Sequence, residues 1–284
     1  MKLLRWLGYG VAVLAGIAVV AALIVYVLSQ RALADAPGPR PSHLAKPTPA
    51  QLADASRQLD VLGCRDCHGA KLEGKNFFND PMLANLYAPN LTLVAAKATD
   101  AQLDQAIRQG IGRDGRPLFV MPSQQYQFLT DAETAALIAA IRATPKAGSE
   151  TPPVKLGPIG RIGLATGKFV NGPKLVAQYR GSPVPDLGPQ FARGRHLVQT
   201  ACSECHGANL KGREVEPGVV SADLAIAGAY DLDQFKALMR TGAPPSHRDL
   251  KLMDDVAKVT FSHYNDDEIA AIHAYLAERA KRQP

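Results

Sequence analysis

Two stretches of this 284-residue sequence decide the fold: CRDCHGAKLEG at residues 64–74 and CSECHGANLKG at residues 202–212. Seven of their eleven positions are identical, and together they contain all four cysteines of the chain. Self-similarity of this kind indicates an internal repeat. We therefore expect two homologous domains, each headed by one Cys-x-x-Cys-His doublet.

The similarity continues downstream of each doublet. Gly110 is followed eleven positions later by Met121, and Gly242 is followed eleven positions later by Met253. Each half then closes with a similar amphipathic segment, which begins at Thr130 in the first half and at Asn265 in the second. The repeat predicts one domain over residues 48–146, a connector over 147–188 and a second domain over 189–284.

Helix-start signals predict an all-α fold. Five times, a Thr, Asn or Asp is followed three residues later by Gln or Glu, the pattern of a capping box: Thr48/Gln51, Thr99/Gln102, Thr130/Glu133, Asp231/Gln234 and Asn265/Glu268. A further helix is expected to begin near Pro189 and run towards Cys202. No long alternating pattern of the kind that marks a strand is present.

The N-terminal segment is apolar enough to cross a membrane. Leu7 to Leu28 would span roughly 33 Å as a helix, against a hydrocarbon core of ~30 Å. Trp6 and Tyr26 lie near its ends, where aromatic side chains favour the membrane interface. Ala32-Leu33-Ala34 also has the form of a signal-peptide cleavage site, but the apolar run is longer than a signal core. We expect an uncleaved transmembrane anchor over residues 1–31 and a tether over 32–47.

The positive net charge of +6 does not indicate a nucleic-acid-binding domain. Residues 51–145 contain 9 Lys/Arg and 10 Asp/Glu, and residues 190–284 contain 12 and 13. The surplus lies in the N-terminal arm and in the connector, whereas nucleic-acid binding requires a basic patch on a folded domain.

The doublets are the attachment signature of c-type haem. Two thiols three positions apart on a helical turn lie on one side and can reach both vinyl groups of one porphyrin. The histidine that follows becomes the proximal iron ligand. The sequence predicts two haem c groups, attached through Cys64, Cys67, Cys202 and Cys205, with His68 and His206 as axial ligands.

Other uses of paired cysteines fit less well. A zinc ribbon places its doublets ~15–20 residues apart, and here the offset is 138. A thioredoxin-like pair requires a βαβ setting, which is absent from the predicted elements.

Methionine is the expected distal ligand, because its soft sulfur opposite histidine suits a haem that cycles between ferrous and ferric states. The choice is between Met82 and Met121 in the first half, and between Met239 and Met253 in the second. Met239 falls inside a predicted helix and is expected in the core. The matched spacing from glycine favours Met121 and Met253. For the second haem, His247 and His263 remain alternatives.

The run GIGRDGRPLFVMP, residues 110–122, resembles bacterial class I cytochrome c domains. These domains occur in the cytochrome subunits of membrane-bound alcohol and gluconate dehydrogenases, and the resemblance covers both repeats and the anchor. It implies two tandem class I cytochrome c domains held on the periplasmic side of a bacterial inner membrane. The redox partners implied are a dehydrogenase, an oxidase or a quinol-linked complex. The di-haem component of a cbb3-type oxidase has the same inventory.

The resemblance also bears on the connector and on catalysis. The proline- and glycine-rich connector is either a solvated linker or, as the resemblance suggests, an ordered strap over the domains. We expect an electron carrier with no catalytic residues. The alternative enzyme, a di-haem peroxidase or thiosulfate dehydrogenase, needs an exchangeable sixth ligand or a reactive cysteine ligand, and the chain has no fifth cysteine.

Overall fold

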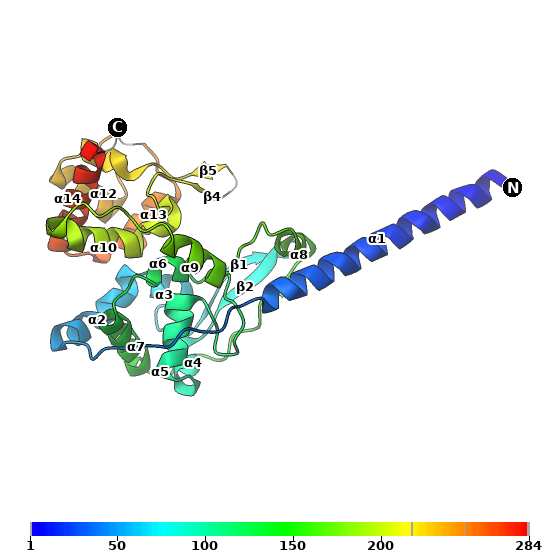
Figure 1. Ribbon diagram of the computed structural model, residues 1–284, viewed down its shortest axis with the longest axis horizontal. Helices are drawn as coiled ribbons and strands as arrows, with labels where there is room; N and C mark the ends of the chain where they lie inside the picture. Colours follow the sequence, from blue (N-terminus) through cyan, green and yellow to red (C-terminus); the bar gives the residue numbers. More distant parts are fainter. Residues whose placement is uncertain (1, 217, 247, 283–284) are drawn as a thin grey trace.

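The computed structural model describes residues 2–216, 218–246 and 248–282. A long helix, α1 (Lys2–Ala34), projects from a body made of two stacked helical units (Figure 1). We refer to residues 48–146 as domain 1 and to residues 189–284 as domain 2. The mostly helical architecture confirms the all-α prediction for the described residues.

Domain 1 begins with α2 (Pro49–Val61), which leads directly into the first doublet. Its elements follow in this order: α2, α3 (Cys64–His68), β1 (Lys75–Asp80), β2 (Ala84–Ala88), α4 (Leu91–Lys97), α5 (Asp100–Asp104), η1 (Gln105–Gln109), α6 (Ser123–Tyr126) and α7 (Asp131–Ala143). Helices α2 and α7 pack against each other, and their apolar faces meet in a core that includes Leu59, Leu72 and Ile138.

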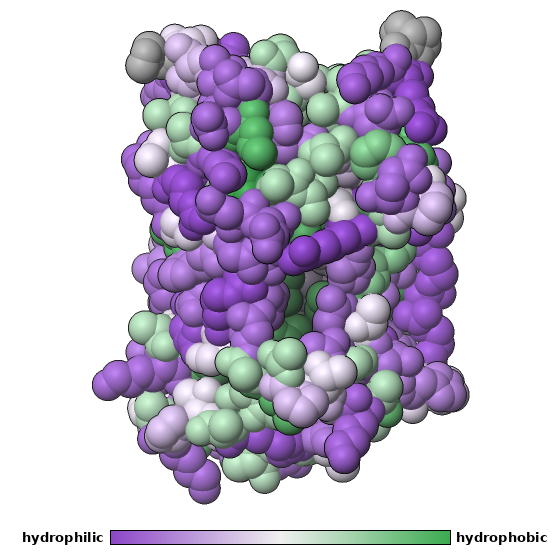
Figure 2. All heavy atoms as spheres, turned by 90° about the vertical axis from the view of Figure 1, so that its left-hand side faces the viewer, coloured by the Kyte–Doolittle hydropathy of each residue, from purple (hydrophilic) through white to green (hydrophobic). Residues whose placement is uncertain are grey.

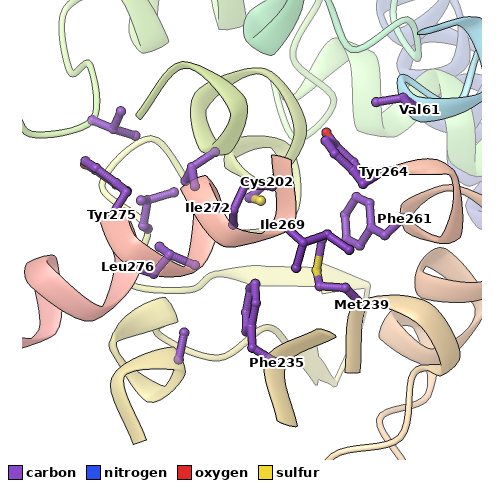
Figure 3. Close-up of a cluster of buried hydrophobic side chains, with 14 of the residues drawn as sticks. Val61, Cys202, Phe235, Met239, Phe261, Tyr264, Ile269, Ile272, Tyr275 and Leu276 are labelled. Atoms are coloured by element: carbon purple, nitrogen blue, oxygen red, sulfur yellow. The ribbon is translucent and has the colours of Figure 1, made fainter. Parts of the chain in front are cut away.

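Domain 2 repeats this plan. Its elements are η2 (Pro189–Phe191), α10 (Ala192–Ala201), α11 (Ser203–His206), β4 (Glu214–Glu216), β5 (Val219–Val220), η3 (Leu224–Ala229), α12 (Leu232–Thr241), α13 (Leu252–Val259), η4 (Phe261–His263) and α14 (Asp266–Arg282). Helix α14 packs on α10 and η3. Figure 3 shows the resulting core, in which Phe235, Ile269 and Ile272 surround Cys202 and Met239.

The predicted helix starts are confirmed. Both hydrogen bonds of the capping box are present at all five predicted positions, and Pro189 opens the turn that leads into α10. Two short hairpins were not predicted. Strand β1 pairs antiparallel with β2, and β4 pairs antiparallel with β5. They are too short and too irregular for an alternating pattern to stand out in the sequence.

The connector is an ordered strap over domain 1. Its strand β3 (Lys155–Leu156) pairs with β2, and its helix α9 (Gly172–Arg180) packs on α6. Between them, α8 (Pro158–Ala165) packs on α1. The Asn171 amide donates to the Asp35 carbonyl over 2.8 Å, which ties the strap to the tether. Of the two expectations for this segment, the ordered strap is correct.

Candidate functional site

Both doublets lie at the same point of their domains, in a short helix directly after the first long helix. In α3, Cys64, Cys67 and His68 have the spacing that places side chains on one helix face. Cys202 caps α11, which contains Cys205 and His206. All four cysteines lie within the described residues, and neither doublet is closed by a disulfide.

Each doublet histidine is oriented by a backbone carbonyl. His68 Nδ1 lies 2.8 Å from the Pro89 carbonyl oxygen, and His206 Nδ1 lies 2.7 Å from the Ala222 carbonyl oxygen. A carbonyl only accepts, so Nδ1 must hold the proton and donate it. The other nitrogen, Nε2, is then the free lone-pair site on each ring. A hydrogen bond of this kind is typical of metal-bound histidine.

The protonation of these imidazoles suits a metal ligand. Burial lowers the pKa of His68, and the Pro89 carbonyl offsets this in part. Burial likewise lowers the pKa of His206, against the opposing influence of the Ala222 carbonyl and Asp223. Both rings are therefore held in the neutral form, the only form whose Nε2 can bind iron.

A glycine in each domain makes room for the backbone segment that carries the acceptor carbonyl. Gly74 (φ +86°) and Gly212 (φ +87°) end the two repeated stretches, and each N–H donates to the carbonyl of the doublet histidine. A Cβ on Gly74 would lie 2.9 Å from the Asn90 nitrogen, and one on Gly212 would collide with the Ser221 carbonyl oxygen. Sequence analysis missed this role, although the identical glycine at the end of both stretches was the available signal.

The buried surroundings of the doublet cysteines disfavour the thiolate form. Burial raises the pKa of Cys64 and of Cys202 to about 12, and that of Cys205 to about 11. Two thiols that face one side and an oriented imidazole with a free Nε2 are the groups that thioether attachment and axial ligation of haem c require.

The predicted distal methionines each pack on the core of their own domain. Met121 and Cys64 both contact the core of domain 1, and Met253 contacts the core of domain 2, to which Cys202 belongs. Met82 lies in the turn between β1 and β2 and is 52% exposed. Met239 is 3% exposed within α12, and its sulfur points into the core in Figure 3. Unlike Met121, which precedes α6, Met253 lies in the first turn of α13.

The rival histidines differ in position. His263 is exposed at the end of η4, beside domain 1 residues of a pocket that also contains Asp60 and Arg65. His247 lies outside the described residues. His273 places Nε2 2.8 Å from the Tyr230 carbonyl oxygen and its ring 5.2 Å from that of Phe235.

The two domains contact each other through matched segments. In domain 1, α6 follows Met121 and contacts α10 and α11 of domain 2. In domain 2, η4 follows the helix of Met253 and contacts α2 of domain 1. Val61, at the end of α2, packs into the core of domain 2 beside Phe261 and Tyr264 (Figure 3). Each domain therefore contacts the other through the equivalent segment, as expected for an interface between two repeats.

Two ion pairs at this interface occupy matching positions in the two domains. Glu268, the capping-box glutamate of α14, accepts two hydrogen bonds from Arg57 on α2, each over 2.9 Å. Glu133, the capping-box glutamate of α7, lies 2.9 Å from His196 Nε2 on α10. Each glutamate thus starts the last helix of its own domain and also binds the other domain.

Gln125 of α6 connects the domains close to both doublets. Its Oε1 accepts from the Glu204 N–H over 3.3 Å, and its amide nitrogen lies 3.4 Å from Glu204 Oε2. Tyr126, the next residue of α6, donates its hydroxyl hydrogen to the Leu62 carbonyl two residues before Cys64, so α6 contacts the segments of both doublets.

Glu204 is the residue between the two cysteines of the second doublet. Burial raises its pKa to about 7, which Arg213 partly opposes. After burial and Asp66, Glu204 is a further cause that raises the pKa of Cys67 in the first doublet.

Comparisons with known proteins identify the family that both halves of the chain resemble. The cytochrome c family model matches residues 37–145 and 191–280. One of the subunits of nicotinate dehydrogenase from Pseudomonas putida is 26% identical over 214 residues, which are 71% of this chain and 18% of that protein. The cytochrome c subunits of the quinone alcohol dehydrogenases of Gluconacetobacter polyoxogenes and Komagataeibacter europaeus are each 24% identical over 259 residues, 79% of this chain and 54% of theirs. The chain thus spans about half, or less, of the length of these relatives.

The two matched segments together cover well over half of the chain and contain both doublets. Among the described residues, one helix, over Leu4–Ala34, is long and apolar enough to cross a membrane. The chain belongs to the cytochrome c family, binds haem c and is an electron carrier rather than an enzyme.

Proposed function

We propose that the chain carries two haem c groups, one in each domain. The observation on which this rests is the duplicated histidine geometry. In both domains the doublet histidine donates Nδ1–H to a backbone carbonyl, and a glycine at the matching position of each domain makes room for the segment that carries this carbonyl. The hydrogen bond leaves Nε2 for the iron. Cys64 and Cys67 would hold one haem through thioether bonds, and Cys202 and Cys205 would hold the other.

We assign Met121 and Met253 as the distal axial ligands. Each packs on the same core as the first cysteine of its doublet, and each lies eleven positions after a glycine that ends a helix with positive φ. Histidine–methionine ligation supplies a low-spin haem that exchanges one electron without binding oxygen. The chain's own contribution is to fix the ligands and to exclude water with an apolar core.

We propose that electrons cross between the domains through the interface around Gln125. This side chain contacts the Glu204 backbone between the cysteines of the second doublet, and α6, which contains it, begins two residues after Met121. Electron transfer falls steeply with distance, so two cofactors must be held close and at fixed separation. The paired contacts Arg57–Glu268 and Glu133–His196 hold the domains in that arrangement.

We place the chain in a bacterial inner membrane as a single-pass protein with both domains in the periplasm. Helix α1 supplies the anchor, and its last turns contact α8, so cleavage after Ala34 would remove residues that the fold uses. The relatives are subunits of dehydrogenases by name, and this supports a dehydrogenase as the electron donor. A membrane quinone or an oxidase would be the acceptor.

Haem stoichiometry is the direct test. The full chain, produced with a haem-attachment system, should show two haems per polypeptide by pyridine haemochrome and intact mass. The double substitution Cys202→Ala/Cys205→Ala should leave one haem, and Cys64→Ala/Cys67→Ala should leave the other. A wild-type chain with a single haem contradicts the proposal. Co-purification from detergent-solubilised membranes, followed by mass spectrometry, identifies the partner, and absence of any dehydrogenase argues against that donor.

A further inference from the structure

Helix α8 of the strap is fixed to the end of α1. The Arg161 guanidinium lies 4.8 Å above the Tyr26 ring, and its Nη1 donates to the Ser29 hydroxyl over 3.1 Å. The residues of α1 that lose exposure, Val25, Ser29, Ala32 and Leu33, recur at the spacing of one helix face. Figure 1 shows α8 beside the last turns of α1, on the side of the body from which α1 projects.

This contact determines the height of α8 relative to a bilayer. The apolar run of α1 ends at Leu28 and has the length of a hydrocarbon core. Tyr26 therefore lies at the edge of that core, and Ser29 lies about 5 Å further out, at the level of the lipid headgroups. A helix packed against both of them lies at the membrane surface.

Helix α8 is also fixed rigidly to domain 1. The Ile159 N–H donates to the Met82 carbonyl and the Gly157 N–H donates to the Leu83 carbonyl, each over 2.9 Å. A Cβ on Gly157 or on Gly160 would collide with one of these carbonyl oxygens. The turn between β1 and β2 thus holds α8 by backbone contact, and whatever binds α8 sets the orientation of domain 1.

The outward side of this unit is apolar and basic. Ile159, Ile162, Phe169 and Met82 are each between 48% and 52% exposed. Residues 154–170 contain Lys155, Arg161 and Lys168 and no acidic residue. The nearby carboxylate of Asp80 is used locally, because its Oδ1 accepts from the N–H groups of Met82 and Leu83. A short apolar helix flanked by cations is typical of segments that lie in a membrane interface.

We propose that α8 and the β1–β2 turn dock on the anionic phospholipid surface of the membrane that α1 crosses. Ile159, Ile162 and Phe169 enter the interfacial layer, and Lys155 and Lys168 contact lipid phosphates. The occupant is lipid because the bilayer begins at the level where α8 contacts α1. The opposite end of the molecule, seen in Figure 2, is largely hydrophilic. The inference rests on the part of the proposed function that keeps α1 as an anchor.

The docked arrangement gives the chain two attachments to the membrane. A single helix followed by a tether would leave the domains free to rotate above the surface. With α8 in the interface, domain 1 presents one fixed side to the membrane and the opposite side to the periplasm. Lipid would then orient the first haem domain towards membrane-bound partners.

Cysteine accessibility in nanodiscs tests this docking. In the haem-loaded full chain all four native cysteines are consumed by thioether bonds, so an introduced cysteine is the one free thiol. Ile162→Cys is compared with Leu52→Cys on α2, because the two side chains are 49% and 47% exposed. Helix α2 lies away from α1 in Figure 1. Val20→Cys reports the anchor itself. The probe is an uncharged polyethylene-glycol maleimide, and the rate is read from the mass shift.

In nanodiscs that contain phosphatidylglycerol, Ile162→Cys should react roughly tenfold more slowly than Leu52→Cys, and Val20→Cys should not react. Lys155→Gln/Lys168→Gln should raise the rate at Ile162→Cys in these nanodiscs, and should leave it unchanged in pure phosphatidylcholine. If Ile162→Cys and Leu52→Cys react at equal rates while Val20→Cys stays unreactive, the docking on lipid is wrong and the membrane anchor stands. The exposed side of α8 would then be expected to bind a protein. A reactive Val20→Cys would overturn the anchor, and the docking with it.

Discussion

The two domains share the Cys-x-x-Cys-His doublet and the hydrogen bond that orients its histidine, and they differ in the segments that cover the doublet. In domain 1 the strap, the tether and a hairpin with strands of six and five residues surround the doublet. His68 is 7% exposed there. In the described part of domain 2 the equivalent hairpin is shorter, and His206 is only half-buried. The repeat therefore duplicates the two cysteines, the histidine, the carbonyl that accepts from it and the glycine that makes room for that segment. The segments that cover each site differ, and the strap and the tether pack on domain 1.

The largest expected effects come from replacing the two proposed distal ligands one at a time. Met121→Ala should remove the weak sulfur–iron absorption band of one haem and Met253→Ala that of the other. Each should lower one reduction potential by an amount on the order of a few hundred millivolts, within the ~0.8 V range that axial ligands set. Spectra and redox titration measure both. Met82→Ala is the control, and a band that persists at full strength in Met121→Ala would show that this ligand is wrongly assigned.

The glycines that make room for the segments with the acceptor carbonyls come next. Gly212→Ala should destabilise domain 2, because a Cβ would meet the Ser221 oxygen and the positive φ is strained, at a cost of about 3 kcal/mol. Gly74→Ala should cost somewhat less, since its closest contact is the movable Thr151 side chain. Chemical denaturation followed at each haem measures this. Gly115→Ala, where the Cβ has open space, controls for the strain of positive φ alone.

The interface ion pairs should differ in strength. Glu268 is 7% exposed and Arg57 satisfies its carboxylate, so Arg57→Ala should destabilise the domain contact by about 2 kcal/mol. Glu133 is 34% exposed and remains partly hydrated, so His196→Ala should cost less than about 1 kcal/mol. Denaturation midpoints measure both, with Lys97→Ala as an exposed control. Equal costs would show that the two halves of the interface are energetically alike.

The helix starts were predictable because the residues that specify them are neighbours in the sequence, and each doublet could be recognised for the same reason. Thr48, Thr99 and Thr130 each cap a helix that their own neighbours specify. The acceptors Pro89 and Ala222 were not predictable, since they act through backbone atoms and lie 21 and 16 residues from their histidines. The pairing of Arg57 with Glu268 spans 211 residues and depends on how the domains dock. No residue pattern encodes that arrangement directly.

The smallest expected effect is a pH dependence confined to one of the two ion pairs. Burial alone would raise the pKa of Glu133, but the hydrogen bond and charge of His196, with the Thr130 cap, lower it from 4.5 to about 2. A carboxyl whose folded pKa is lowered stabilises the fold above its unfolded pKa and loses that contribution as the pH falls through the folded value. Stability should therefore decline between pH 4.5 and 2 by no more than about 1 kcal/mol, since solvent screens a partly exposed pair. Glu133→Gln should flatten this part of the denaturation profile, whereas Lys46→Ala, at an exposed lysine of the tether, should leave it unchanged. An unchanged slope in Glu133→Gln would mean that the pair with His196 does not contribute to the stability of the fold in this pH range.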